Sequence, residues 1–330
     1  MNILIAMAKD ETTASFLTEN NIKMLESLGN VTWLDFEGKL TPEVMRDGLV
    51  DIDVVVCGWS APQFTAEVIS KANQLKLVAY VAGSVHNKVS NEMYEKGIRI
   101  VCGNEAFAMG VAEGTMAYML ASLRHLDEYD IRNCYWRSSQ WGAECLLRKT
   151  VGLVGYGAIS RHLIPMLRPF GVKIKLFSNH TTEEQAAELG VQKADLKEIF
   201  STCDIISLHC ARSDANYHLV NDELLSSMRD GALLVNTSRG DVVDSEALLK
   251  HLQVGRIRAA LDVFEGEPLP EDSPFRKLGN HVLMQPHCGG PTVDFRYHAA
   301  ELVIWDIKNL QEGKPLENEI LPWRAKMMTK

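Results

Sequence analysis

The chain has 330 residues, enough for two domains, and its 46% hydrophobic and 23% charged residues are typical of a globular protein. This composition excludes a disordered or collagen-like chain. Forty-three acidic and 34 basic residues give a net charge of -9, which disfavours nucleic acid and anionic membrane surfaces as partners.

The cysteines give no sign of a disulfide framework or a zinc site. There are seven of them, an odd number, and they are scattered without a CxxC pair. The apolar start at 2–6 is too short for a membrane span and lacks the basic leader of a signal peptide. We therefore expect a cytoplasmic protein, with no metal and no membrane association.

Short apolar runs rich in β-branched residues alternate with longer helical patterns in the first hundred residues. This alternation predicts a parallel sheet with helices on both faces. The expected strands are 2–6, 31–34, 53–57, 77–81 and 99–102.

The same pattern resumes after a long helix-like segment at 106–124. It predicts a second sheet of at least six strands, at 150–154, 173–177, 204–208, 232–236, 258–263 and 281–285. Two such sheets indicate two doubly wound α/β domains. No Pro/Gly/Ser-rich linker separates them, so the junctions should be helices. The amphipathic run 299–310 is the last helix, and periodicity alone does not assign it to either domain.

An aromatic stretch at 133–141, which includes Trp136 and Trp141, lies where no periodicity is clear. It suits an arm packed on its own domain. It suits an oligomer interface equally well, because Trp, Tyr and Arg are enriched at interfaces.

A glycine turn follows the strand expected at 150–154. Gly155 and Gly157 precede a helical pattern, and the next strand is expected at 173–177. In dinucleotide-binding folds the first glycine permits a tight turn, and the second lets the backbone approach a pyrophosphate at the helix N-terminus. Because the elements follow in this order, the turn predicts a dinucleotide site.

Two positions depart from that pattern. Ser160 replaces the third glycine, which allows the helix to pack closely on the strand. Serine is small enough that we expect this packing to be kept. The acidic residue expected about 20 residues on is absent, and Ser178, Asn179 and His180 stand there instead. Without a carboxylate a 2′-phosphate is not repelled, and these side chains with Arg161 could donate hydrogen bonds to it. Since there is no arginine fork, NADP is favoured only slightly over NAD.

Three polar residues follow the last three expected strands. Arg239 follows 232–236, Glu267 follows 258–263 and His287 follows 281–285. Each has an alternative structural role, such as pairing of Arg239 with Asp241. However, parallel strands bring their carboxyl ends to one edge, where ligands bind. There the three supply the parts for hydride transfer to a carbonyl: a cation for a carboxylate, a proton donor, and a carboxylate to orient it.

With the motifs at 154–159, 233–244, 261–270 and 286–290, in this order, the chain resembles the D-isomer-specific 2-hydroxyacid dehydrogenase family. That family includes glyoxylate and hydroxypyruvate reductases and phosphoglycerate dehydrogenases. The resemblance spans nearly the whole chain. It implies a D-2-hydroxyacid dehydrogenase that works with NAD(P)H, more in the direction of 2-ketoacid reduction than of hydroxyacid oxidation, and as a homodimer.

The resemblance also implies roles for single residues. Arg239 falls on the catalytic arginine, Glu267 on the glutamate, His287 on the acid/base histidine, and Asp262 on a residue near the nicotinamide amide. Together with the strand end at 178–180, the implied cofactor contacts are Gly155, Tyr156, Gly157, Ala158, Ile159, Ser178, Asn179, His180, Cys210, Thr237, Ser238, Asp262 and Gly289.

A discontinuous substrate domain follows from the resemblance as well. It would be a flavodoxin-like domain of residues 1–103 and 292–330, and a Rossmann NAD(P)-binding domain would take 104–291. This assigns the last helix to the substrate domain.

The substrate carboxylate would be held by backbone amides of Ala82, Gly83 and Ser84, together with Arg239. Here Ala82, Ser84 and His86 depart from the family's more usual Gly-x-Gly and Asp-Asn pattern, which leaves the substrate open. His86 either adds a cation to the cleft or is a surface histidine. Trp59 either faces the cleft or serves core or interdomain packing.

The leading hypothesis is therefore an NAD(P)-dependent 2-ketoacid reductase. Two alternatives stay open. One is a dehydrogenase of the same fold for a small anion such as formate or phosphite. The other is a non-enzymatic corepressor-like module that senses NAD.

Overall fold

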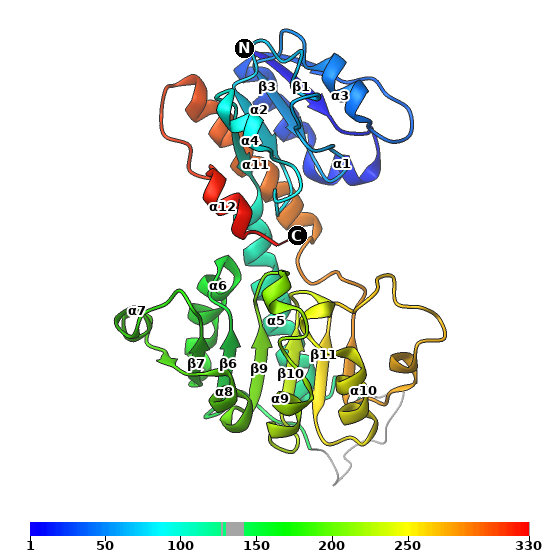
Figure 1. The fold of residues 1–330 in the computed structure, drawn as a ribbon, viewed down its shortest axis with the longest axis vertical. Coiled ribbons are helices and arrows are strands. Elements are labelled where there is room, and N and C mark those ends of the chain that lie inside the picture. The colour runs from blue at the N-terminus through cyan, green and yellow to red at the C-terminus, as the bar shows by residue number, and fades with distance from the viewer. Residues whose placement is uncertain (127, 130–141, 330) are drawn as a thin grey trace. The chain divides into compact units, whose positions relative to one another are not determined.

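The computed structural model describes residues 1–126, 128–129 and 142–329 (Figure 1). The chain forms two compact units: unit 1 comprises 1–107 and 291–330, and unit 2 comprises 108–290. The sequence predicts these divisions after residues 103 and 291. The aromatic stretch at 133–141 lies outside the described residues.

Unit 1 is built on a five-stranded sheet in the order β2-β1-β3-β4-β5, in which every pairing is parallel. Its central strands are buried on both faces, as expected from their continuous apolar runs. The strands are β1 (Asn2–Ala6), β2 (Asn30–Trp33), β3 (Val54–Cys57), β4 (Leu77–Tyr80) and β5 (Arg99–Cys102).

Helices cover both faces of this sheet (Figure 1). One core lies beneath α3, α4 and α12, and the other beneath α1, α2 and α11. The bounds are α1 (Glu11–Phe16), α2 (Glu19–Leu28), α3 (Pro42–Gly48), α4 (Asn91–Glu95), α11 (Val293–Gln311) and α12 (Pro322–Met327).

Helix α11 begins earlier than its apolar stripe predicts. Thr292 caps it by accepting the N–H of Phe295, so the helix starts at Val293 rather than near Ala299. Its buried Val303, Ile304 and Ile307 join the core of unit 1. Helix α11, which comes late in the chain, thus packs on a sheet whose strands all lie within residues 2–102.

Unit 2 holds a seven-stranded parallel sheet in the order β12-β11-β10-β9-β6-β7-β8. Its strands are β6 (Thr150–Val154), β7 (Lys173–Phe177), β8 (Gln192–Lys193), β9 (Ile205–Leu208), β10 (Leu233–Asn236), β11 (Arg258–Leu261) and β12 (Val282–Met284). Six of these lie within the predicted runs. The two-residue, polar β8 is too short to show a period.

The two faces of the second sheet carry separate cores. Strand residues alternate between them: Leu234 faces α8, α9 and α10, whereas its neighbours Leu233 and Val235 face α5 and α6. The elements of this unit are α6 (Ala158–Leu167), η1 (Arg168–Phe170), α7 (Glu183–Glu188), α8 (Leu196–Thr202), η2 (Asp214–Asn216), α9 (Asp222–Ser227), η3 (Gly240–Val242), α10 (Ser245–Gln253) and η4 (Pro274–Lys277). Both sheets confirm the predicted fold class.

Helix α5 (Asn104–Arg124) contains the division between the units. By length and composition alone it could cross a membrane. However, Ala112, Met116, Met119 and Leu123 are buried in the core of unit 2. The apolar character of α5 is thus explained by packing.

Candidate active site

The glycine turn lies at the switch point of the second sheet. Strand β6 stands between β9 and β7, where the strand order reverses and where open α/β sheets bind ligands. Gly155 has φ +105, and a Cβ there would lie 2.7 Å from the carbonyl oxygen of His209. Only glycine satisfies both conditions.

The start of α6 is suited to a phosphate group. A Cβ on Gly157 would meet nothing within 4 Å, so the turn is open where an anion would approach. The first amides of a helix have no intrahelical partners, and among the described residues no side chain caps this one. The half-buried Tyr156, Ala158 and Ile159 complete the turn. These features fit a dinucleotide pyrophosphate.

Ser160 has a function of its own at the third-glycine position. It is fully buried, and its hydroxyl donates to the carbonyl oxygen of Gly155 at 2.7 Å. The substitution therefore ties the first turn of α6 to the glycine turn.

The end of β7 presents a serine with a free donor function. Ser178 Oγ accepts the N–H of His180 at 3.2 Å and the hydroxyl of Thr181 at 2.9 Å. Neither contact uses the proton of the Ser178 hydroxyl itself. Asn179 and His180 are exposed beside it. The strand end thus offers donors and, at 178–180, no carboxylate.

His209 and Cys210 directly follow β9, and both are largely shielded from solvent. Burial raises the pKa of the Cys210 thiol to about 11. His209 contacts Ser207 Oγ through Nε2 at 2.9 Å, while its buried Nδ1 has no partner among the described residues. Burial lowers the pKa of His209 to about 4, so this ring is neutral at physiological pH.

The loop after β10 is shaped by a buried asparagine. Asn236 Oδ1 accepts both the N–H and the hydroxyl of Ser238, and Asn236 Nδ2 donates to the carbonyl of Arg239 at 3.0 Å. Thr237 Oγ1 lies 3.0 Å from Thr115 Oγ1 on α5. The loop that carries Arg239 is therefore fixed by side chains on both sides.

Arg239 is half-buried, and its guanidinium makes few hydrogen bonds to the described residues. Its Nη1 donates to the carbonyl of Ser238 at 2.7 Å, the one hydrogen bond of this guanidinium to the described part of the chain. Burial lowers the pKa of Arg239, while nearby Glu267 and Asp241 oppose this effect. Asp241 itself pairs with Arg212 at 2.7 Å. The guanidinium thus keeps donors for a ligand.

Glu267 and His287 form a direct pair at the ends of β11 and β12. His287 Nδ1 lies 2.6 Å from Glu267 Oε2, and Glu267 Oε1 accepts the N–H of Phe264 at 2.9 Å. Both carboxylate oxygens are therefore used, and the ring is held with Nε2 directed away from the glutamate. That is the arrangement of a proton donor and its orienting carboxylate.

Asp262 uses both of its carboxylate oxygens as hydrogen-bond acceptors. Its carboxylate accepts the N–H groups of Cys288 and Gly289 and the phenol of Tyr118. Within unit 2 it therefore holds the histidine loop, a role that the resemblance does not imply.

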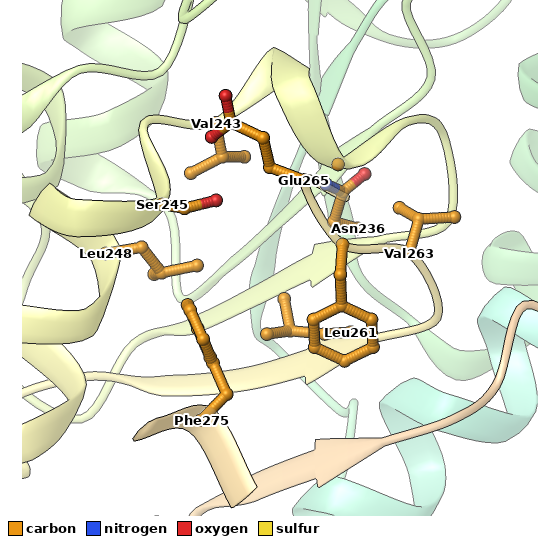
Figure 2. Close-up of a pocket in the computed structure, with 10 residues that line it drawn as sticks. Asn236, Val243, Ser245, Leu248, Leu261, Val263, Glu265 and Phe275 are labelled. Atoms are coloured by element: carbon orange, nitrogen blue, oxygen red, sulfur yellow. The ribbon is translucent and has the colours of Figure 1, made fainter. Parts of the chain in front are cut away.

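Two cavities adjoin these loops. One, about 520 Å³ in volume, is lined by Glu267, His287 and largely apolar neighbours such as Leu269 and Met284. The other, shown in Figure 2, lies among residues that include Leu248, Leu261 and Phe275 and measures about 10 Å³. It has room for one water at most, so we assign it no ligand.

The predicted carboxylate loop lies in unit 1, at the carboxyl end of β4. Ala82 is buried, and Gly83 and Ser84 are half-buried. Ser84 Oγ donates to the carbonyl of Thr329 at 2.7 Å, and His86 Nδ1 lies 3.3 Å from the carbonyl of Ala325. Two of the three departures from the family pattern therefore contact the segment at 325–329.

Trp59 lies at the same edge of that sheet. It is 46% exposed, its ring packs edge-on against Phe16 and Phe107, and Arg296 lies over it at 5.5 Å. The Trp59 ring therefore packs against its neighbours within unit 1 and also remains partly exposed.

Sequence reasoning missed Asn236, Thr115, Tyr118 and His209. Polar residues at the end of a buried strand were a usable signal for Asn236 and His209. Thr115 and Tyr118 gave none, because a helix position shows its partner only when the fold is known.

The family model described as D-isomer specific 2-hydroxyacid dehydrogenase, NAD binding domain, matches residues 116–289. Glyoxylate reductase of Thermococcus litoralis is 32% identical over 310 residues, which cover 90% of this chain and 92% of that protein.

Longer relatives match as well. D-3-phosphoglycerate dehydrogenase of Methanocaldococcus jannaschii is 33% identical over 92% of this chain, which spans 58% of that enzyme's length. The crystal structure of a phosphoglycerate oxidoreductase from Rhizobium etli has a TM-score of 0.81 at 25% identity, covering 96% of this chain and 97% of that chain.

Proposed function

Since the chain belongs to the D-isomer-specific 2-hydroxyacid dehydrogenase family and is an NAD-binding oxidoreductase, we propose that it reduces a small 2-ketoacid to the D-2-hydroxyacid. The observation that carries this proposal is the pair of Glu267 and His287 at 2.6 Å, near Arg239 and on the sheet edge that bears the glycine turn. We propose a homodimer in the cytoplasm as its working form.

Arg239 would bind the carboxylate and carbonyl oxygens of the ketoacid. A guanidinium is planar and donates in parallel to two oxygens. Partial burial strengthens such contacts, because water competes less for the donors. The backbone amides of 82–84 would hold the same carboxylate, as the resemblance implies.

His287 would give its Nε2 proton to the carbonyl oxygen. The bound nicotinamide supplies the hydride that reduces the carbonyl carbon. Glu267 fixes the orientation of the ring through Nδ1. In the reverse direction the neutral ring would take the hydroxyl proton.

We propose that the cofactor site accepts NADP at least as well as NAD. Ser178 retains a donor and no carboxylate stands at 178–180. A ribose 2′-phosphate would therefore meet donors rather than a like charge.

The test is a panel of 2-ketoacids, from glyoxylate and hydroxypyruvate to branched and aromatic acids, run once with NADH and once with NADPH. We expect turnover with at least one ketoacid, and its loss in His287→Ala. Formate and phosphite with NAD+ or NADP+ complete the panel. Turnover with these anions alone would contradict ketoacid reduction, and cofactor binding without any turnover would favour an NAD-sensing module.

A further inference from the structure

We infer that Tyr118, on α5, is a positioning residue for His287; this inference rests on the function proposed above. The phenol of Tyr118 donates to Asp262 Oδ1 at 3.0 Å. The same carboxylate accepts the N–H of Cys288 at 2.9 Å and that of Gly289 at 3.0 Å. Tyr118 therefore fixes the Asp262 carboxylate, which in turn fixes the backbone of the two residues directly after His287.

The backbone of His287 needs this support. Its φ of +55 lies in the left-handed region, which residues with a Cβ normally avoid. Such a conformation persists only where the surroundings determine it. Here the N–H of His287 donates to the carbonyl of Asp262 at 2.9 Å, and Asp262 also fixes residues 288 and 289. If the Asp262 carboxylate were less firmly fixed, the His287 backbone could shift and the imidazole would lose its alignment with Glu267.

One side of α5 contacts two of the site's loops. Gly114, Thr115 and Tyr118 are neighbours on the helix surface. A Cβ on Gly114 would lie 2.1 Å from the carbonyl oxygen of Gly289, and Thr115 contacts Thr237 beside the arginine loop. This side of α5 thus sets the arginine loop and the histidine loop relative to each other within unit 2.

The phenol is suited to this role because it remains a donor. Burial, followed by the negative charge of Asp262, raises the pKa of Tyr118. The hydroxyl is therefore protonated throughout the range in which the enzyme would work, and it complements the carboxylate at every pH of interest.

The experiment compares Tyr118→Phe with the matched control Tyr94→Phe. Tyr94 also donates one phenolic hydrogen bond at 3.0 Å, to the carbonyl of Ile320 in unit 1. Three quantities are measured for each variant: kcat with the best ketoacid of the panel, thermal midpoint, and hydrogen exchange at the amides of Cys288 and Gly289.

We expect Tyr118→Phe to lower kcat roughly 10- to 100-fold, as small displacements of catalytic groups do. Exchange at the two amides should accelerate at least tenfold, on the order of the loss of one charge-assisted hydrogen bond. Tyr94→Phe should change neither quantity. A merely structural role would instead lower the thermal midpoint and leave kcat unchanged in the folded variant.

A kcat within twofold of wild type in Tyr118→Phe would overturn the inference, and so would a lowered kcat with unchanged amide exchange. If the wild-type protein reduces none of the ketoacids, the proposed function fails by itself. Exchange at Cys288 and Gly289 then still decides whether Tyr118 holds the loop.

Discussion

Glu267 engages both of its oxygens, so its replacements should differ according to what they keep. Glu267→Gln can still accept one hydrogen bond, from Phe264 N–H or His287, whereas Glu267→Ala accepts none. We expect kcat for ketoacid reduction to fall in both, more in the alanine variant. Steady-state kinetics with the best ketoacid measure this order, and equal activities would remove Glu267 from the proton-transfer pair.

His287→Ala tests the proton donor itself. General acid catalysis typically contributes 10²- to 10⁴-fold, so kcat should fall by about that factor. Cofactor affinity, followed by quenching of protein fluorescence, should stay nearly unchanged. Substantial residual activity would mean that another group protonates the carbonyl oxygen.

The guanidinium of Arg239 is proposed to bind substrate by its shape as well as its charge. Arg239→Lys keeps the charge but loses the planar pair of donors. We expect kcat to fall and KM for the ketoacid to rise, because these contacts strengthen as charge develops on the carbonyl oxygen. Near-normal kinetics in a correctly folded variant would exclude Arg239 from the substrate site.

Cofactor choice is proposed to depend on the strand end at 178–180. Ser178→Asp would place a carboxylate where a 2′-phosphate is proposed to lie. Like charges in a poorly hydrated contact cost several kcal/mol, so the ratio of kcat/KM for NADPH to that for NADH should drop by at least tenfold. Asn179→Asp, at an exposed neighbour, serves as the comparison. A wild type that prefers NADH a hundredfold would contradict this interpretation of 178–180.

At the scale of elements, the loop at 82–84, which is predicted to bind the substrate carboxylate, is hydrogen-bonded to the last described segment of unit 1. Ser84→Gly would remove its bond to Thr329 and restore the residue more usual in the family. A hydrogen bond contributes about 0.5–1.5 kcal/mol, so KM for the ketoacid should rise about two- to tenfold. kcat should be unaffected. An unchanged KM would show that the loop keeps its shape without this bond.

How far sequence alone predicts these elements depends on where the determining contacts lie. The strand run 150–154 is predicted with its observed bounds, because burial on both faces leaves an almost uninterrupted apolar pattern. The run 173–177 is predicted with its observed bounds as well, although its two lysines alternate with buried apolar residues. The start of α11 was missed, since it depends on the cap at Thr292. Arg239, Glu267 and His287 were visible as polar residues after strands. Tyr118 was not, because its contact with Asp262 spans 144 positions.

At the scale of the whole molecule, stability should depend on pH through one buried histidine. The pKa of His209 is lowered from 6.5 to about 4 in the folded protein, while an unfolded chain protonates it near 6.5. The neutral folded form is therefore favoured above pH 6.5, and this contribution is lost as the pH falls towards 4. The loss amounts to about 3 kcal/mol.

Thermal unfolding at pH 7.5, 6 and 4.5 measures this effect. We expect the thermal midpoint to fall with pH, and to fall less in His209→Asn. An equal slope in wild type and His209→Asn would mean that carboxylates alone govern acid stability.

The discontinuity of unit 1 has a consequence for synthesis on the ribosome. Its five strands emerge first, yet the apolar face formed by Ile3, Ile5, Val54 and Val56 awaits α11, which follows only after all of unit 2 has been translated. Unit 2 is continuous and can fold as it emerges. During that interval the nascent amino-terminal sheet exposes a surface that binds other hydrophobic chains, so chaperone occupancy should peak before residue 293 leaves the exit tunnel and fall once Val303, Ile304 and Ile307 cover that surface.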